Sequence, residues 1–186
     1  ELRNRAVIDL FEPGSTMKPF TLSAALMSGQ YTTESTINTS PGYLRFGRFT
    51  IRDSANYGTI DLEKLLIKSS NVGASKIALS LPQDAIWNMD YELGIGSPVG
   101  IGFPGEASGV LPSHPKWHPS ELATLSYGYG LSVSTLQLAQ AYMTLANAGY
   151  RVPVTIFKQD VPGQGKQVIP HGVATDVLKM MEAVVQ

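Results

Sequence analysis

Apolar residues recur along the chain with mostly helical spacing, and short polar stretches rich in glycine and proline separate them. Residues 15–28 and 134–148 are two such segments, and both are too apolar to form exposed helices. Each segment is followed by a glycine, Gly29 or Gly149, where a helix commonly terminates. We therefore predict two buried helices, and we expect the first to be the central one.

Shorter patterns predict the remaining elements. Residues 43–51 favour a hairpin that turns near Gly47, whereas residues 2–10 and 152–157 favour strands. Further helices are expected over residues 61–68 (capped by Thr59 or Asp61), 72–81, 82–94 and from Thr175 or Asp176 through Gln186, with irregular chain over residues 31–41 and 96–112. The pattern is dominated by helices and supplies few strands for a sheet.

Ser15 and Lys18 lie three residues apart at the start of the first buried segment. Residues at this spacing share a helix face, so the lysine can lie over the serine. A serine hydroxyl becomes a good nucleophile when a base takes its proton, and a desolvated lysine can act as that base. Pro13-Gly14 predicts a turn before the serine, and Pro19 is expected to push Lys18 away from α geometry. The alternative at this point is an ordinary helix start with a solvated lysine.

A second candidate group is Ser69-x-Asn71, about fifty residues further along the chain. The Ser69 hydroxyl can relay a proton between Lys18 and a leaving amine, while the Asn71 amide can hold a substrate amide and orient Lys18. The alternative is structural, because Ser69 or Ser70 can cap the helix that follows.

The composition excludes several classes of protein. The 186 residues are 43% hydrophobic and 16% charged with a net charge of −1, values typical of one globular domain. The basic residues are scattered, so nucleic acid is not an expected partner. Cysteine is absent, and no apolar run approaches the ~18 residues of a membrane span. His114 and His118 have the spacing of helical metal ligands, but Pro115 and Pro119 break a helix there, so we predict no metal and no cofactor.

Longer stretches give these motifs a context. The sequence resembles the transpeptidase domain of the class B penicillin-binding proteins, and specifically their division-septum branch in Gram-negative bacteria. The resemblance implies an α+β fold of the transpeptidase and serine β-lactamase type. It rests on residues 2–6, 11–20, 67–73, 102–106, 126–133 and 136–139.

The resemblance implies a periplasmic enzyme of the inner membrane, anchored by an N-terminal helix, that cross-links peptidoglycan and has divisome membrane proteins as partners. Ser15 would attack the penultimate D-alanine of a stem peptide ending in D-Ala-D-Ala, and β-lactams would acylate the same serine. Lys18 would be the base, with Ser69 and Asn71 as proton relay and substrate clamp. Tyr129 would line the cleft, and its alternative is core packing beside a glycine turn.

One family motif is missing from the sequence. The family carries Lys-Thr-Gly or Lys-Ser-Gly on a strand beside the cleft, and these 186 residues contain neither; Gly165-Lys166-Gln167 fits neither the composition nor the place. The resemblance implies that the missing strand follows the last helix and supplies a carboxylate-binding lysine and one oxyanion donor. Losing such a donor costs about 10²- to 10³-fold in rate. We therefore expect residues 1–186 to be a transpeptidase domain incomplete at both ends and inactive alone.

The sequence leaves three other functional classes as alternatives. A serine β-lactamase needs a glutamate for deacylation, and Glu92, Glu106 and Glu121 are available, though none stands in a Glu-x-x-x-Asn context. A β-lactam sensor or non-catalytic binding domain would have no chemical need to keep all four motif residues. A purely structural protein would not be acylated at all.

Overall fold

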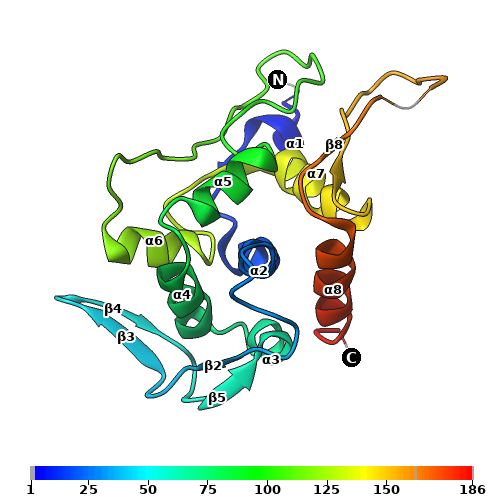
Figure 1. Cartoon of the computed structure of the whole chain (residues 1–186). Helices are drawn as coiled ribbons and strands as arrows, with labels where there is room; N and C mark the ends of the chain where they lie inside the picture. The colour runs from blue at the N-terminus through cyan, green and yellow to red at the C-terminus, as the bar shows by residue number, and fades with distance from the viewer. Residues whose placement is uncertain (1–2, 162, 186) are drawn as a thin grey trace.

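Helix α2 (Lys18–Met27) lies at the centre of the molecule, with the longer helices arranged around it (Figure 1). The computed structural model describes residues 3–161 and 163–185. Phe20, Leu22 and Ala25 of α2 are fully buried, since α4, α5 and α8 pack against this helix. The other helices are α1 (Arg5–Ile8), α3 (Leu62–Ile67), α4 (Asn71–Ser80), α5 (Ala85–Glu92), α6 (Pro119–Leu125), α7 (Thr135–Ala146) and α8 (His171–Glu182).

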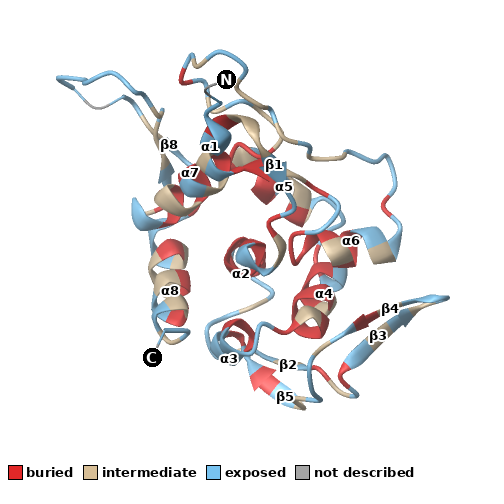
Figure 2. Ribbon diagram, turned by 180° about the vertical axis from the view of Figure 1, so that it is seen from behind, coloured by how far each residue is buried: buried red, intermediate tan, exposed pale blue. Residues whose placement is uncertain are grey.

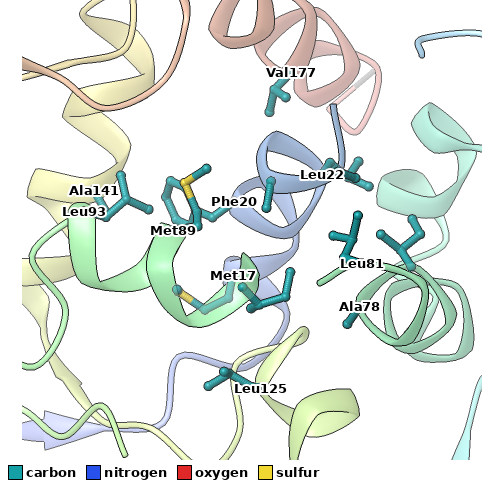
Figure 3. Packing of buried hydrophobic residues seen from close by; sticks show 14 of the residues in the cluster. Met17, Phe20, Leu22, Ala78, Leu81, Met89, Leu93, Leu125, Ala141 and Val177 are labelled. Atoms are coloured by element: carbon teal, nitrogen blue, oxygen red, sulfur yellow. The ribbon is translucent and has the colours of Figure 1, made fainter. Parts of the chain in front are cut away.

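The core is a ring of side chains from several helices that close on α2. Figure 3 shows that Met17, Phe20 and Leu22 point into this cluster. Around them lie Ala78 and Leu81 at α4, Met89 and Leu93 at α5, Leu125 of α6, Ala141 of α7 and Val177 of α8. Because every long helix contributes to one cluster, the position of α2 is determined from all sides.

The strands of the described residues form short antiparallel pairs. Their members are β1 (Leu10–Phe11) with β6 (Val133–Ser134), β2 (Thr36–Asn38) with β5 (Thr59–Asp61), β3 (Tyr43–Phe46) with β4 (Phe49–Arg52), and β7 (Tyr150–Arg151) with β8 (Lys166–Gln167). Buried residues concentrate in α2 and α4, whereas the β3–β4 hairpin is largely exposed (Figure 2). This mixture of many helices and few short strands confirms the predicted α+β class.

Several predicted elements are present where the pattern placed them. The two buried helices are α2 and α7, and each is followed by a glycine with positive φ, +72° at Gly29 and +86° at Gly149. The predicted hairpin is β3–β4. Asp61 rather than Thr59 caps α3, because its side chain accepts a hydrogen bond from the Lys64 N–H.

The N-terminal strand prediction is wrong in part. Residues 5–8 form α1, because the Asn4 side chain accepts a hydrogen bond from the Ala6 N–H and begins a helical turn. Only the short strand β1 follows, and residues 1–2 lie outside the described residues. The region 31–41 is not wholly irregular either, since β2 lies within it and pairs Ile37 with Ile60.

The C-terminal predictions also need correction. Residues 152–157 form no strand in the structure, and Pro153 removes a donor that a ladder there would need. Helix α8 begins at His171 rather than at Thr175 or Asp176, directly after Pro170, whose ψ of 141° is not helical. It ends at Glu182, so it does not run to Gln186, which lies outside the described residues.

Two helix starts at prolines differ from the predictions. Helix α5 begins at Ala85 rather than at Pro82, since the Ala85 N–H bonds to the Pro82 carbonyl in a turn. Helix α6 lies where Pro119 predicts a break in the helix. Pro119 is instead the first residue of the helix, and His118 caps it together with Glu121.

Candidate active site

Two glycine turns packed backbone to backbone position Ser15. The Gly14 N–H donates a hydrogen bond of 3.0 Å to the Gly128 carbonyl. Both glycines have positive φ, +60° and +82°, and a Cβ on Gly128 would lie 2.0 Å from the Gly14 carbonyl oxygen. Only glycine therefore permits this approach. The Tyr142 hydroxyl donates to the Thr16 carbonyl at 2.7 Å and ties the turn to α7.

Lys18 does not have the distorted backbone that Pro19 was expected to impose. Its φ of −57° and ψ of −37° are helical, so that prediction is wrong. The departure from α geometry lies one turn earlier, in the 3-10 helix η1 (Gly14–Met17) that carries Ser15. Proline is tolerated in the first turn, where its missing N–H has no partner to lose.

The structure brings Ser15, Lys18, Ser69 and Asn71 together. The Lys18 Nζ lies 2.9 Å from the Ser15 Oγ, 2.8 Å from the Ser69 Oγ and 2.8 Å from the Asn71 Oδ1. It also lies 2.7 Å from the Ser69 carbonyl oxygen. The lysine side chain is 1% exposed, whereas Ser15 itself is exposed. A buried amine thus faces an accessible hydroxyl.

The turn between α3 and α4 is held by two residues that carry no motif role. The Ser70 Oγ accepts a hydrogen bond from the Gly73 N–H at 2.8 Å and donates to Asp53 at 2.6 Å. The other Asp53 oxygen accepts from the Val72 N–H at 3.0 Å. Ser69 has a φ of +50°, a strained value for a residue with a side chain. The cap and the carboxylate therefore hold Ser69 in this conformation.

Burial changes the acid–base properties of Lys18. Desolvation lowers the pKa of the amine from 10.5 to about 8, and the nearby carboxylate of Asp53 raises it by a smaller amount. The contacts fit a neutral amine. Two partners, the Ser69 carbonyl and the Asn71 Oδ1, can only accept, and a neutral amine has two N–H groups for them. One lone pair then remains, and it can accept a hydrogen bond from one of the two hydroxyls, at Ser15 or Ser69.

The site opens onto an apolar cavity of about 380 Å³. Its lining combines the motif residues Ser15, Lys18 and Ser69 with side chains of α3, α7 and the end of α8, among them Leu66, Tyr142 and Met181. A substrate group next to the Ser15 hydroxyl therefore has both polar partners and an apolar wall.

Tyr129 lies beside the Ser15 turn rather than in the core. Its side chain is 47% exposed, so the core-packing alternative is wrong. A Cβ on Gly14 would lie 3.8 Å from its ring, and the Tyr127 ring packs on it edge-on with centroids 5.6 Å apart. Tyr129 is thus held next to Gly14, the residue before Ser15, and is not among the residues that line the cavity.

The four polar residues are predictable from the sequence, but the residues that support them are not. The sequence indicates Ser70 only as a possible cap, and Asp53 follows the β4 strand without any pattern that marks it. The only signal in the sequence was the serine itself, three residues before Gly73 in a helix start. Asp53 acts through the folded hairpin, which no local pattern reveals.

The other candidate groups are engaged elsewhere. The ring of His114 packs on Trp117, while the His118 ring accepts a hydrogen bond in the α6 cap. Within the described residues no cluster of histidines and carboxylates could hold a metal ion. Glu92 forms an ion pair with Lys166. Glu106 accepts a hydrogen bond from the Gly100 N–H, and Glu121 accepts one from the His118 N–H. No helix among the described residues is long and apolar enough to cross a membrane.

Comparison with known proteins places this geometry in a family. All 186 residues match the family model described as the penicillin binding protein transpeptidase domain. The chain is 42% identical over 183 residues to peptidoglycan D,D-transpeptidase FtsI of Escherichia coli, covering 98% of this chain and 31% of the relative. It is 40% identical over 185 residues to the probable peptidoglycan D,D-transpeptidase PbpC of Pseudomonas aeruginosa, covering 100% and 33%. The chain thus spans about a third of the length of these curated relatives.

A solved structure agrees with these relatives. The transpeptidase domain of Burkholderia pseudomallei penicillin-binding protein 3 has a TM-score of 0.94 and 43% identity, over 99% of this chain and 56% of that one. The sequence matches cover the whole chain and this structural match nearly all of it, so they include the Ser15 turn and the α3–α4 turn together. The chain therefore belongs to the transpeptidase domain family of the class B penicillin-binding proteins, as the resemblance indicated.

Proposed function

We propose that this chain carries the nucleophilic half of the active site of a peptidoglycan D,D-transpeptidase. The Ser15 Oγ attacks the carbonyl of the penultimate D-alanine while the neutral Lys18 amine takes the hydroxyl proton. The tetrahedral intermediate collapses as its C–N bond breaks, and the proton held by Lys18 passes through Ser69 to the nitrogen of the leaving terminal D-alanine. The amine of a second stem peptide then attacks the ester carbonyl and gives its proton to Lys18, which passes a proton to the Ser15 Oγ as the C–O bond breaks.

One observation carries this proposal: the Lys18 Nζ contacts the Ser15 Oγ, the Ser69 Oγ and the Asn71 Oδ1 at once. A buried amine with a lowered pKa, in contact with an exposed hydroxyl, is the arrangement that activates a serine. Asn71 serves as substrate clamp and orients Lys18, and the exposed ring of Tyr129 contacts the substrate at the entrance.

The proposed substrates, inhibitors, location and partners are based on the family. We propose peptidoglycan stem peptides ending in D-Ala-D-Ala as substrates and β-lactams as covalent inhibitors at Ser15. Periplasmic placement, an N-terminal membrane anchor and divisome membrane partners rest on the septal relatives alone. We also propose that residues 1–186 are an incomplete domain and that Lys-[Ser/Thr]-Gly lies in another part of the longer protein.

The test uses the full-length protein that contains this chain and a labelled penicillin. Intact mass should show one stable adduct, which Ser15→Ala abolishes and which Ser113→Ala, a change at an exposed loop serine, leaves in place. A thioester or stem-peptide substrate should release D-alanine or its analogue. Rapid loss of the label would indicate a β-lactamase, a stable adduct without product release a sensor, and no adduct a structural protein. Any of these three results contradicts the proposal.

A further inference from the structure

The β3–β4 hairpin has two faces of opposite character. Its register pairs Tyr43 with Arg52 and Arg45 with Thr50, so these four side chains lie on one face. The opposite face packs on the body of the molecule, with Leu44, Phe46 and Ile51 against residues of α4 and α6. Figure 2 shows the hairpin projecting beside α4 with much of its surface exposed. The first face is therefore free to meet a ligand.

This free face concentrates positive charge. Residues 43–52 contain three arginines and no acidic residue, although the chain as a whole has a net charge of −1. Arg45, Arg48 and Arg52 are all exposed, and within the described residues none of them forms an ion pair. Two of them lie on the free face and Arg48 lies in the turn.

The two arginines of the free face are partly oriented without a ligand. The Arg52 guanidinium lies 5.5 Å from the centre of the Tyr43 ring, a cation–π contact. The Arg45 Nε donates to the Gly47 carbonyl at 3.3 Å. Neither contact uses the whole guanidinium fork, which matches the two oxygens of a carboxylate. The face is thus arranged for an anion.

The base of the hairpin reaches the candidate active site. The Arg52 carbonyl accepts a hydrogen bond of 3.5 Å from the Asn71 Nδ2, while the Oδ1 of the same amide contacts Lys18. The next residue, Asp53, holds the α3–α4 turn. A peptide clamped by Asn71 therefore lies next to the main chain of Arg52, in the strand that carries one of the two arginines of the free face. Arg45 lies two positions further along the hairpin, and each residue of a strand spans about 3.3 Å.

We propose that Arg52 and Arg45 bind a carboxylate side chain of the peptide substrate and so select acidic stem peptides. The inference rests on the proposed function, since the substrate must be a peptide held at Asn71. The Asn71 contact at the base of the hairpin favours a bound peptide, because a peptide held at Asn71 can extend along the hairpin. An anionic membrane surface would not require that contact.

The experiment compares two peptides in the full-length protein. Both end in D-Ala-D-Ala, and they differ only in one upstream carboxylate that is free in one peptide and amidated in the other. We expect kcat/KM to be about tenfold higher for the acidic peptide, the size expected for two exposed charge pairs. The ratio should fall toward one in Arg45→Gln/Arg52→Gln and as salt rises to about 0.5 M. The matched control, Lys116→Ala/Lys179→Ala, removes two exposed positive charges elsewhere and should keep the ratio.

The possible outcomes distinguish a failure of the arginine proposal from a failure of the proposed transpeptidase function. A ratio near one in the wild type, or an unchanged ratio in the double arginine variant that keeps its circular dichroism spectrum, overturns the inference alone. Arginine-dependent binding to vesicles of anionic phospholipid with an unchanged peptide ratio also overturns it, in favour of a lipid surface. Absence of a penicillin adduct in the wild type overturns the proposed function, and the inference falls with it.

Discussion

At the scale of single residues, the proposed reaction uses the neutral form of Lys18 as the base toward Ser15. With a pKa of about 8, about a tenth of the amine is neutral at pH 7 and about half at pH 8. We therefore predict that the rate of acylation by a penicillin rises nearly tenfold per pH unit between pH 6 and 7.5 and levels off above pH 8.5. Stopped-flow measurement on the full-length protein tests this, and a rate that stays flat from pH 6 to 9 would show that Lys18 is not the base.

We expect Asn71 to affect the protonation equilibrium of Lys18 as well. Its Oδ1 lies 2.8 Å from the Lys18 Nζ, so Asn71→Asp places a negative charge there and favours the ammonium form. We predict that the midpoint of the pH–rate profile moves up by at least about one unit, with slower acylation at pH 7. Asn71→Ala is the matched change without charge. If both variants lose rate with an unmoved midpoint, Asn71 acts only as a clamp.

At the scale of elements, the contact between the two glycine turns determines where Ser15 lies. A Cβ on Gly128 would lie 2.0 Å from the Gly14 carbonyl oxygen, whereas a Cβ on Gly130 would meet nothing within 4 Å. Both positions have a φ near +80°. Gly128→Ala should therefore slow penicillin acylation by at least about 100-fold.

Gly130→Ala serves as the control for backbone strain alone. It should cost about 1–2 kcal/mol of unfolding free energy and keep acylation within about tenfold. Acylation rates and thermal unfolding of the two variants measure the difference. Equal rates for both would mean that the turn can move without loss of function.

The sequence predicts those elements whose boundaries depend on local chemistry. The β3–β4 hairpin, α2, α3 and α7 have clear periodicity and clear end signals at Gly47, Asp61, Gly29 and Gly149. Several errors lie at prolines: Pro119, expected to break a helix, is the first residue of α6, whereas Pro82, expected to open a helix, lies in the turn before α5. Proline has the same local chemistry in both roles, and only packing of the following turn decides between them.

The candidate site was predictable in its residue types but not in its supports. Ser15 and Lys18 are linked by helical spacing, and the family resemblance supports the second candidate group, Ser69-x-Asn71, as proton relay and substrate clamp. Asp53 is brought to the site only by folding of the hairpin, so local spacing cannot identify it. The same is true of Gly128, whose requirement for glycine comes from a distant carbonyl group.

At the scale of the whole molecule, we propose that the active site is completed by a part of the longer protein outside residues 1–186. The chain spans about a third of its curated relatives, and these 186 residues hold no Lys-[Ser/Thr]-Gly. We predict that residues 1–186 alone turn over a D-Ala-D-Ala peptide at least about 100-fold more slowly than the full-length protein. Product release per mole of folded protein measures this. Equal rates would show that the missing strand is dispensable.

The burial of Lys18 also affects the folding equilibrium. Its pKa is about 8 in the folded chain against 10.5 when solvated, so between these values the unfolded state binds more protons and stability rises with pH. Below pH 8 the folded state carries a desolvated ammonium at a cost of about 3 kcal/mol.

Urea unfolding from pH 7 to 10 should therefore show a rise that Lys18→Met lacks. Tyr127, whose pKa is raised to about 12, acts in the opposite direction only above about pH 10. A parallel rise in both proteins would assign the effect to other groups. Near neutral pH, then, the residue proposed to activate the serine also favours the unfolded chain, and a ligand of the folded domain that pairs with the ammonium or takes its proton will stabilise the fold.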